Sequence, residues 1–252
     1  MALSETARAN HAALFPGHVS TLRNTDPELI EIFDNFAFDE VLRYGELDTR
    51  TRLMTQLAAL IAIPALGEYR VMLGAALTAG VTPVAAREIV YQAVPYVGMG
   101  KVFDFLHATN DVLTEHGLDL PLPGQSTTSP STREEEGLAV QQRIVGKQVV
   151  DGMYAAAADD EVHIQHYLSA NCFGDHLTRT GLDLKTRELL TFSMLAALGG
   201  CEAQLRGHVT ANLTVGNDRA LLLTVLTQLL PFLGYPRTLN ALRILDDTAP
   251  AA

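Results

Sequence analysis

The sequence contains no tryptophan, and phenylalanine and tyrosine bring the aromatic share to only 6%. Apolar residues still make up 48% of the 252 residues, which is enough to bury a sizeable core. A core built from alanine, leucine and valine suits packed helices better than a β-sandwich. The two cysteines, Cys172 and Cys201, are too few for a disulfide framework, and each remains open as a core residue, a redox partner or a reactive thiol.

Positive charge is also scarce. The chain has 18 lysines and arginines against 29 aspartates and glutamates, for a formal net charge of −11. Nucleic acids and anionic membrane surfaces both attract basic proteins, so neither is expected as a partner. Small molecules and other copies of the chain remain as the expected partners.

Long apolar runs and familiar cofactor motifs are missing as well. The most apolar stretches, LAALIAIPAL and FSMLAALGG, are too short to span a bilayer, and the N-terminus lacks the pattern of a signal peptide. A cytoplasmic protein is therefore expected. No phosphate-binding GxxxxGK[ST] or GxGxxG motif and no GxSxG elbow occurs. His163 and His166 lack a further ligand at metal-binding spacing, so no metal and no cofactor are expected.

What the sequence does contain is an internal repeat. LDTRTRLMTQLAALIAIPAL, from Leu47, resembles LDLKTRELLTFSMLAALGG, from Leu182. Further along, QAVPYVGMGKVFDFL, from Gln92, resembles QLLPFLGYPRTLNAL, from Gln228. The offset is 135 residues for the first pair (47 to 182) and 136 for the second (92 to 228), so the second copy holds one extra residue. The similarity predicts a duplicated module.

The region between the copies, LPLPGQSTTSPSTREEEG, is rich in proline, serine and threonine and then acidic. It predicts a linker at 120–137 between a first module at 1–119 and a second at 138–252, with Glu134 to Glu136 suited to the first turn of a new helix. We expect an all-α fold. In the second copy the pattern predicts four helices: one ending before Gly199, one from about Cys201 to Val215, one capped by Asp218, and one from Pro236 to about Leu245.

Three polar residues of the second copy share one helix face. Cys201, Gln204 and His208 are spaced i, i+3 and i+7, and Cys201 stands at the helix N-terminus, where free N–H groups favour a thiolate. The repeat places Ala65, Glu68 and Met72 at the corresponding positions of the first copy, and Leu53 at that of Glu188. The joint loss of thiol, imidazole and carboxylate indicates that these groups act together, although a buried cysteine or histidine is often only a core residue.

An acidic residue precedes the long helix in both copies, as Glu40 in FDEVLRYGELD and Asp175 in CFGDHLTRTGLD. His176 follows Asp175, and Cys172 precedes it by three residues. A polar group kept in both modules is either a capping residue or part of a site, and the sequence leaves both open.

TRTGLDLKTRELLTFSMLAALGG, QLRGH and GYPRTLNAL together resemble the carboxymuconolactone decarboxylase family, whose superfamily includes alkylhydroperoxidase D. The resemblance is strong in the second copy and weaker in the first, and it indicates the tandem, two-module branch. It implies an all-α fold that assembles into rings. A tandem chain needs half as many subunits as a single-module relative, so a homotrimer is expected.

The resemblance implies two chemistries. The first implied chemistry is decarboxylation, in which His208 matches the family histidine and serves as the acid/base group. Glu188 and Asp175 are then candidates for orienting His208 or moving a proton. The substrate would be a small lactone or oxo acid, and no cofactor is required. Polar residues near these positions are candidates for binding the substrate: Gln204, His176, Glu40 and Glu68.

The second implied chemistry is that of a peroxidase, which requires a Cys-x-x-Cys pair followed by histidine. Cys201 matches the first cysteine, but Gln204 stands where the second belongs, so a sulfenic acid lacks its usual resolving thiol unless the fold brings Cys172 close. A third reading is a non-catalytic protein that binds a small ligand or acts as a scaffold.

Overall fold

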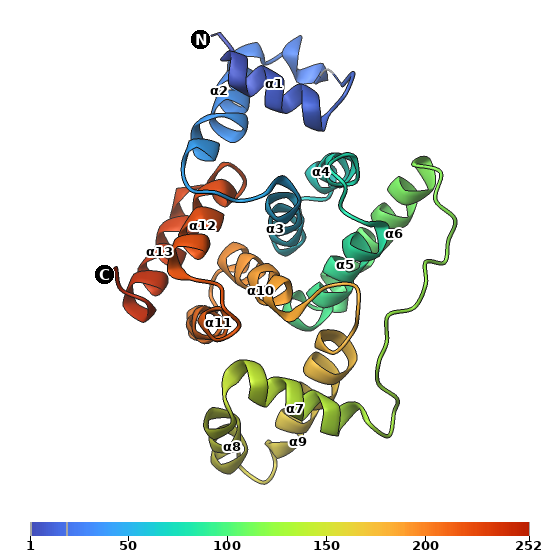
Figure 1. The fold of residues 1–252 in the computed structure, drawn as a ribbon, viewed down its shortest axis with the longest axis vertical. Coiled ribbons are helices and arrows are strands. Elements are labelled where there is room, and N and C mark those ends of the chain that lie inside the picture. Colours follow the sequence, from blue (N-terminus) through green and yellow to red (C-terminus); the bar gives the residue numbers. More distant parts are fainter. Residues whose placement is uncertain (1, 19, 252) are drawn as a thin grey trace.

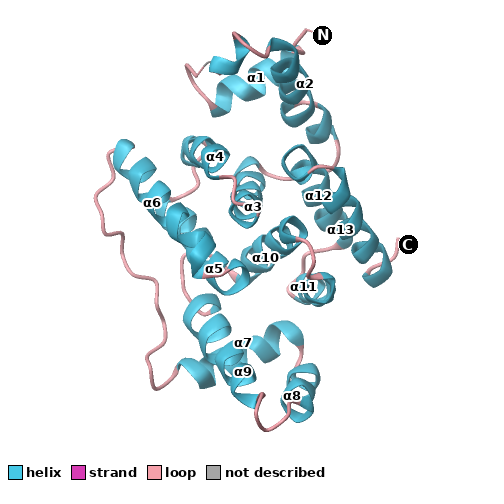
Figure 2. Cartoon of the chain, turned by 180° about the vertical axis from the view of Figure 1, so that it is seen from behind, coloured by secondary structure: helices cyan, strands magenta, loops and turns pink. Residues whose placement is uncertain are grey.

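The computed structural model describes residues 2–18 and 20–251, and within them every regular element is a helix and none is a strand (Figures 1 and 2). The all-α prediction is confirmed. In the same residues, no helix has the length and apolar character needed to cross a membrane.

The helices repeat in the order expected from the duplication. The first copy consists of α2 (Pro27–Phe38), η2 (Glu40–Arg43), α3 (Thr49–Ala62), α4 (Leu66–Thr78), α5 (Pro83–Val97) and α6 (Met99–Glu115). The second copy consists of α9 (Val162–Tyr167), η3 (Leu168–Leu177), α10 (Leu184–Leu198), α11 (Glu202–Thr214), α12 (Arg219–Leu233) and α13 (Tyr235–Thr248). Two further helices precede each copy: α1 (Glu5–Leu14) and η1 (Thr21–Arg23) before the first, and α7 (Arg133–Val145) and α8 (Lys147–Ala156) before the second.

Local signals fix the helix ends, and those at Asp218 and Gly199 lie where the sequence predicts them. The Asp183 carboxylate accepts the backbone N–H of Thr186 at 2.8 Å and starts α10. Asp218 caps α12 through the backbone N–H of Leu221, also at 2.8 Å. Gly199, with φ of 68°, ends α10 in a conformation that is strained for other residues.

The long helices α3 and α10 lie against each other at the centre of the molecule (Figure 1). Buried hydrogen bonds cross between the copies on both sides of this pair. Gln92 on α5 donates to the Arg187 carbonyl at 2.7 Å and to the Thr191 hydroxyl at 3.0 Å. Gln56 on α3 donates to the carbonyl of Gln228 at 3.3 Å. The two modules therefore share one core rather than folding around two separate ones.

The copies also exchange contacts at their edges. The π-helical segment η3 of the second copy packs against α5 of the first, whereas α2 and η2 of the first copy pack against α12 of the second. Any site beside η3 and α10 thus includes a helix from the other module.

Between α6 and α7 the chain runs without a helix along one side of the molecule (Figure 1). Helix α7 begins at Arg133, so the last residues of the 120–137 stretch are helical. Glu134, Glu135 and Glu136 occupy its first turn, as the sequence indicated.

Helix α7 and η3 approach so closely that only glycine fits between them. A Cβ added at Gly137 would overlap the Ser169 carbonyl oxygen and lie 2.6 Å from the Gly174 nitrogen. These neighbours are backbone atoms and cannot swing aside. Gly137 on α7 and Gly174 on η3, where an added Cβ would likewise overlap a backbone oxygen, therefore set the distance between the two helices.

Gly137→Ala should destabilise the protein by about 3 kcal/mol, at the upper end of overpacking costs, because the backbones must move apart. Urea unfolding measures this as a lower midpoint. Gly152→Ala on α8 is the control: a Cβ there meets nothing within 4 Å, and the change should stabilise by roughly 0.5–1 kcal/mol. Equal midpoints for the two variants would contradict the close approach.

Candidate functional site

A cavity of about 660 Å³ lies where α7, α8, η3, α10 and α11 of the second half meet the C-terminal end of α5. Its volume is in the usual range for small-ligand sites. The cavity is lined by polar or sulfur-bearing side chains and by a larger set of apolar ones. The first set is Tyr96, Gln141, Met153, Cys172, Cys201, Gln204 and His208. The rest are Pro95, Val145, Val149, Leu168, Phe173, Leu195, Leu198, Ala203, Gly207 and Ala211.

The central polar contact joins His208 and Glu188. The His208 Nδ1 and the Glu188 Oε2 are 2.7 Å apart, and the Glu188 side chain on α10 is completely buried while His208 is 17% exposed. Asn212, one turn after His208, donates to the backbone carbonyls of Glu188 and His208 and ties α11 to α10. Because a carboxylate only accepts, Nδ1 carries the hydrogen and Nε2 is the nitrogen left for a ligand.

Cys201 lines the cavity, and its Sγ donates to the Leu195 carbonyl at 3.5 Å. Burial, and to a lesser degree the Glu202 charge, raises the pKa of the Cys201 thiol. The pKa of Cys201 therefore moves in the direction opposite to the one that free N–H groups at a helix N-terminus favour.

Cys172, on η3, lines the same cavity as Cys201. Burial raises the pKa of Cys172 to about 12, and the Glu188 charge adds to the effect while Tyr96 opposes it. Both cysteines are free thiols. The fold thus brings the two sulfurs to one cavity but makes both poor nucleophiles.

Iodoacetamide should label Cys172 very slowly in the folded protein. At pH 8 a thiol with a pKa of about 12 is ionised in about one molecule in 10⁴, against about a quarter for free cysteine. The labelling rate in native buffer should be at least ~10²-fold below that in urea, read by peptide mass spectrometry. Equal rates in the two conditions would contradict the assigned burial.

Tyr96 enters the site from the first module. Its ring meets the His208 ring edge-on, with centroids 5.7 Å apart and planes at 76°. The hydroxyl is buried near Cys172 and Thr191 and makes no well-formed hydrogen bond among the described residues. Burial first, and then the charges of Cys172 and Glu188, raises the pKa of Tyr96 well above its ordinary value. The hydroxyl therefore keeps its proton.

Gln141 on α7 is a second donor that sequence reasoning missed. Its Oε1 accepts the Ser169 hydroxyl at 2.6 Å, which leaves the amide nitrogen as the group free to donate. The repeat did contain a signal for Tyr96, since QAVPYVG has tyrosine where QLLPFLG has Phe232. Gln141 had no such signal, because it precedes the repeated segment.

The fold brings some predicted site residues together and leaves others apart. His208, Cys201 and Gln204 line the cavity, with Glu188 directly behind His208. Asp175 does not line it: its carboxylate pairs with Arg133 at 2.7 Å. The remaining candidates are His176, which is half-buried on η3, and Glu40 and Glu68, which are exposed on the first copy; none lines the cavity.

The equivalent region of the first copy is packed differently. Met72, at the position of His208, is 1% exposed. Phe232, at the position of Tyr96, packs edge-on against Phe33, with ring centroids 5.9 Å apart. Hydrophobic packing thus replaces the polar pair there, in line with a structural role for the first copy.

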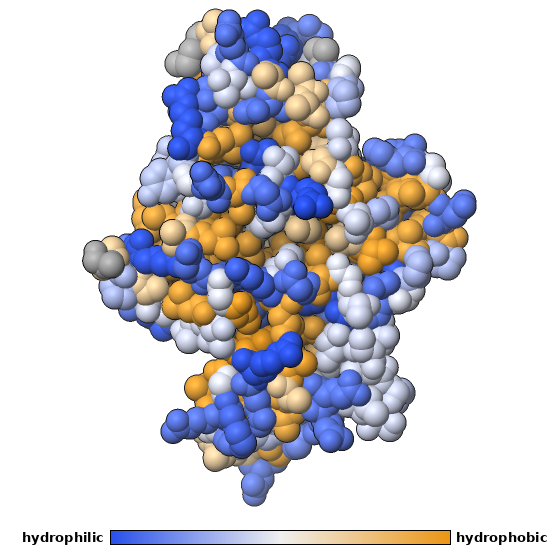
Figure 3. All heavy atoms as spheres, in the orientation of Figure 1, coloured by the Kyte–Doolittle hydropathy of each residue, from blue (hydrophilic) through white to orange (hydrophobic). Residues whose placement is uncertain are grey.

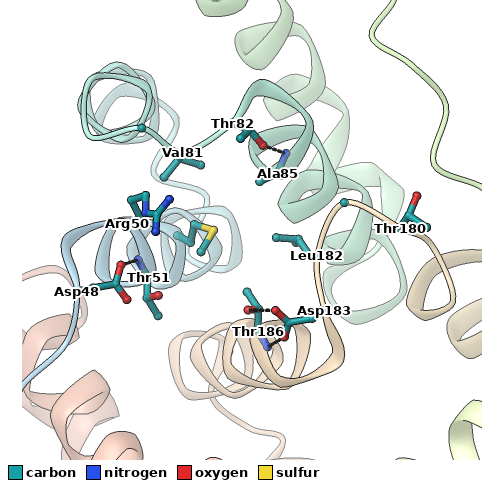
Figure 4. Close-up of a pocket in the computed structure, with 13 residues that line it drawn as sticks. Asp48, Arg50, Thr51, Val81, Thr82, Ala85, Thr180, Leu182, Asp183 and Thr186 are labelled. Atoms are coloured by element: carbon teal, nitrogen blue, oxygen red, sulfur yellow. Dashed lines mark hydrogen bonds between the residues drawn. The ribbon is translucent and has the colours of Figure 1, made fainter.

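A second cavity, of about 670 Å³, lies between the N-terminal ends of α3, α5 and α10 (Figure 4). Several of its polar groups already cap these helices: Thr82 accepts from the N–H of Ala85 at 3.1 Å, and Asp183 from that of Thr186. Neither histidine nor cysteine occurs among the described residues that line it. The His208 cavity is therefore the better candidate for chemistry.

The fold and this site define an all-helical protein of two tandem modules, the second of which holds a histidine–carboxylate pair in a cavity. Residues 27–111 and 163–247 each match the carboxymuconolactone decarboxylase family. The chain belongs to that family. It is also similar to the 4-carboxymuconolactone decarboxylase of Acinetobacter baylyi (strain ATCC 33305 / BD413 / ADP1), with 27% identity over 115 residues, or 46% of this chain and 85% of that protein.

Proposed function

We propose that the protein is a cofactor-free acid/base enzyme that decarboxylates a small oxo acid or carboxylated lactone, or moves a proton on a related carbonyl compound. The observation that carries the proposal is the 2.7 Å hydrogen bond between His208 and the buried Glu188 at the edge of the cavity. Membership of the decarboxylase family supports the reaction class.

The geometry suits such a step. When the bond between the carboxylate and its neighbouring carbon breaks, CO₂ leaves and the electron pair moves onto the conjugated carbonyl oxygen as an enolate. Gln141 lines the cavity, and its amide N–H₂ is a donor that can reach that oxygen. His208 takes up a proton on Nε2 from solvent while Nδ1 keeps its hydrogen bond to Glu188, and Nε2 then delivers that proton to the carbon.

A thiol peroxidase is the second candidate, because Cys172 and Cys201 line one cavity. The Cys201 thiolate would attack hydrogen peroxide to give a sulfenic acid and hydroxide, and the Cys172 thiolate would then displace hydroxide from that sulfur to form a disulfide. The raised pKa of both thiols disfavours this route.

The experiment assays the intact chain for both activities, acid/base catalysis and peroxide reduction. A panel of 3-oxo acids and carboxylated butenolides is followed by CO₂ release, and α-proton exchange of the corresponding ketones and lactones in D₂O is followed by NMR. Catalysis of either, with both thiols free after mild peroxide, is expected. Disulfide formation together with peroxide turnover would overturn the proposal, and ligand binding without any turnover would indicate the non-catalytic reading.

We also propose that the chain assembles with copies of itself, as a trimer. Four large apolar side chains are exposed at equivalent positions of the repeat: Met99 and Phe103 on α6, and Tyr235 and Leu239 on α13. Such surfaces favour association. Light scattering after gel filtration should give three times the monomer mass of 27.3 kDa, and a monomer would contradict the proposal.

A further inference from the structure

The walls of the His208 cavity carry no permanent positive charge. Among the cavity-lining residues of the described chain, none is arginine or lysine, and His208 already gives its Nδ1 hydrogen to Glu188. A carboxylate that enters such a site loses its water shell without gaining a cation, which is costly. The buried Glu188 charge adds repulsion for any second anion.

Neighbouring arginines are committed elsewhere. Arg133 on α7 pairs with Asp175, and the buried guanidinium of Arg187 pairs with Glu88. Neither arginine lines the cavity. A substrate with two carboxylates would therefore find no matching pair of cations here.

The outer wall of the cavity is apolar. Val145 ends α7, Val149 and Met153 follow on α8, and Leu168 and Phe173 face them from η3. Figure 3 shows hydrophobic side chains on the surface where the α7–α8 region, at the bottom of the view, meets the helices above it. An apolar body of a ligand would replace water along this wall.

This wall comes mostly from the part of the chain that lies outside the family match. The two matching segments are 27–111 and 163–247, whereas α7 and α8 span 133–156. The catalytic pair thus lies inside a matched segment, whereas four of the 17 residues that line the cavity, Gln141, Val145, Val149 and Met153, come from α7 and α8. Specificity can then differ from that of other family members while the chemistry is kept.

We propose that the site takes a carbonyl compound with a largely apolar body and at most one ionised group, held with its polar end at His208 and its apolar end against Val149 and Met153. The inference rests on the proposed function for the identity of the site and adds the class of substrate. The expected substrate preference thus differs from that of an enzyme that accepts compact dicarboxylates.

The test measures binding, so it does not depend on turnover. The uncharged fluorophore N-phenyl-1-naphthylamine is bound to the full chain and displaced by γ-decalactone or by decanedioate, which have equal numbers of carbon atoms. The lactone should displace the probe at a concentration at least ~10²-fold lower, equivalent to about 2.7 kcal/mol. Equal displacement, or stronger displacement by decanedioate, would overturn the proposal.

A pair of α8 variants locates the effect. Val149→Lys adds a cation at the cavity wall on a side chain that is 55% exposed, so folding should be retained. It should weaken lactone binding and reduce the preference for lactone over decanedioate at least tenfold. Gln148→Lys places the same charge one residue away, outside the lining, and should leave the preference unchanged. An equal effect of both variants would contradict a cavity-wall role.

The two proposals fail separately. Lactone preference without turnover of any carbonyl compound would remove the proposed function and leave this inference standing. Turnover confined to dicarboxylates, with no lactone binding, would do the reverse.

Discussion

Replacing His208 by alanine should abolish turnover, with a loss in kcat/KM of at least ~10²-fold, because the variant loses the imidazole that donates and accepts the proton. The structure allows no obvious substitute, since Asp175 is paired with Arg133 away from the cavity and Glu188 is buried behind the histidine. The measurement is steady-state turnover of whichever oxo acid or lactone the panel identifies.

Cys201→Ala is the matched control for this prediction. It removes the other chemically distinctive side chain from the same helix face and should keep most of the activity, because burial holds the Cys201 thiol protonated at neutral pH. If Cys201→Ala is as inactive as His208→Ala, the acid/base interpretation fails and the peroxidase interpretation gains.

Glu188 acts through His208 and is a positioning residue. Glu188→Gln should lower kcat by roughly tenfold or more while leaving KM nearly unchanged, because the amide can present its N–H₂ to Nδ1 and favour the wrong tautomer. A change in KM alone would argue against this role.

Glu88→Gln should destabilise the protein by about 3–5 kcal/mol, the usual cost of leaving a buried ion unpaired. Glu88 on α5 is fully buried and receives Arg187 from α10 at 3.0 Å and Arg179 at 2.9 Å. The Arg187 side chain is itself 0% exposed, so it cannot recover hydration when the carboxylate is neutralised. The pair joins the first module to the second.

Urea unfolding at neutral pH measures this loss. The control is Arg70→Ala, which breaks an ion pair with Asp111 whose two side chains are 39% and 54% exposed and should cost at most about 1 kcal/mol. A loss below about 1 kcal/mol for Glu88→Gln would contradict a structural role for the buried pair. Since α5 also presents Tyr96, the variant should weaken binding of N-phenyl-1-naphthylamine too.

Local sequence determined much of this protein. The cap at Asp218 and the stop at Gly199 could be identified because a helix end depends on residues within a turn of it. The shared face of Cys201, Gln204 and His208 followed from helical spacing alone. The link between His208 and Glu188 was indicated by their joint loss in the first copy.

Only the tertiary structure decided which groups surround His208. Tyr96 and Gln141 reach the cavity from helices on opposite sides of the linker, and no spacing rule connects residues so distant in the chain. Position in the repeat suggested Asp175 for the site, yet a nearby arginine pairs with it outside the cavity. Burial likewise reversed the expected pKa shift of Cys201, because desolvation depends on helices that pack from elsewhere in the chain.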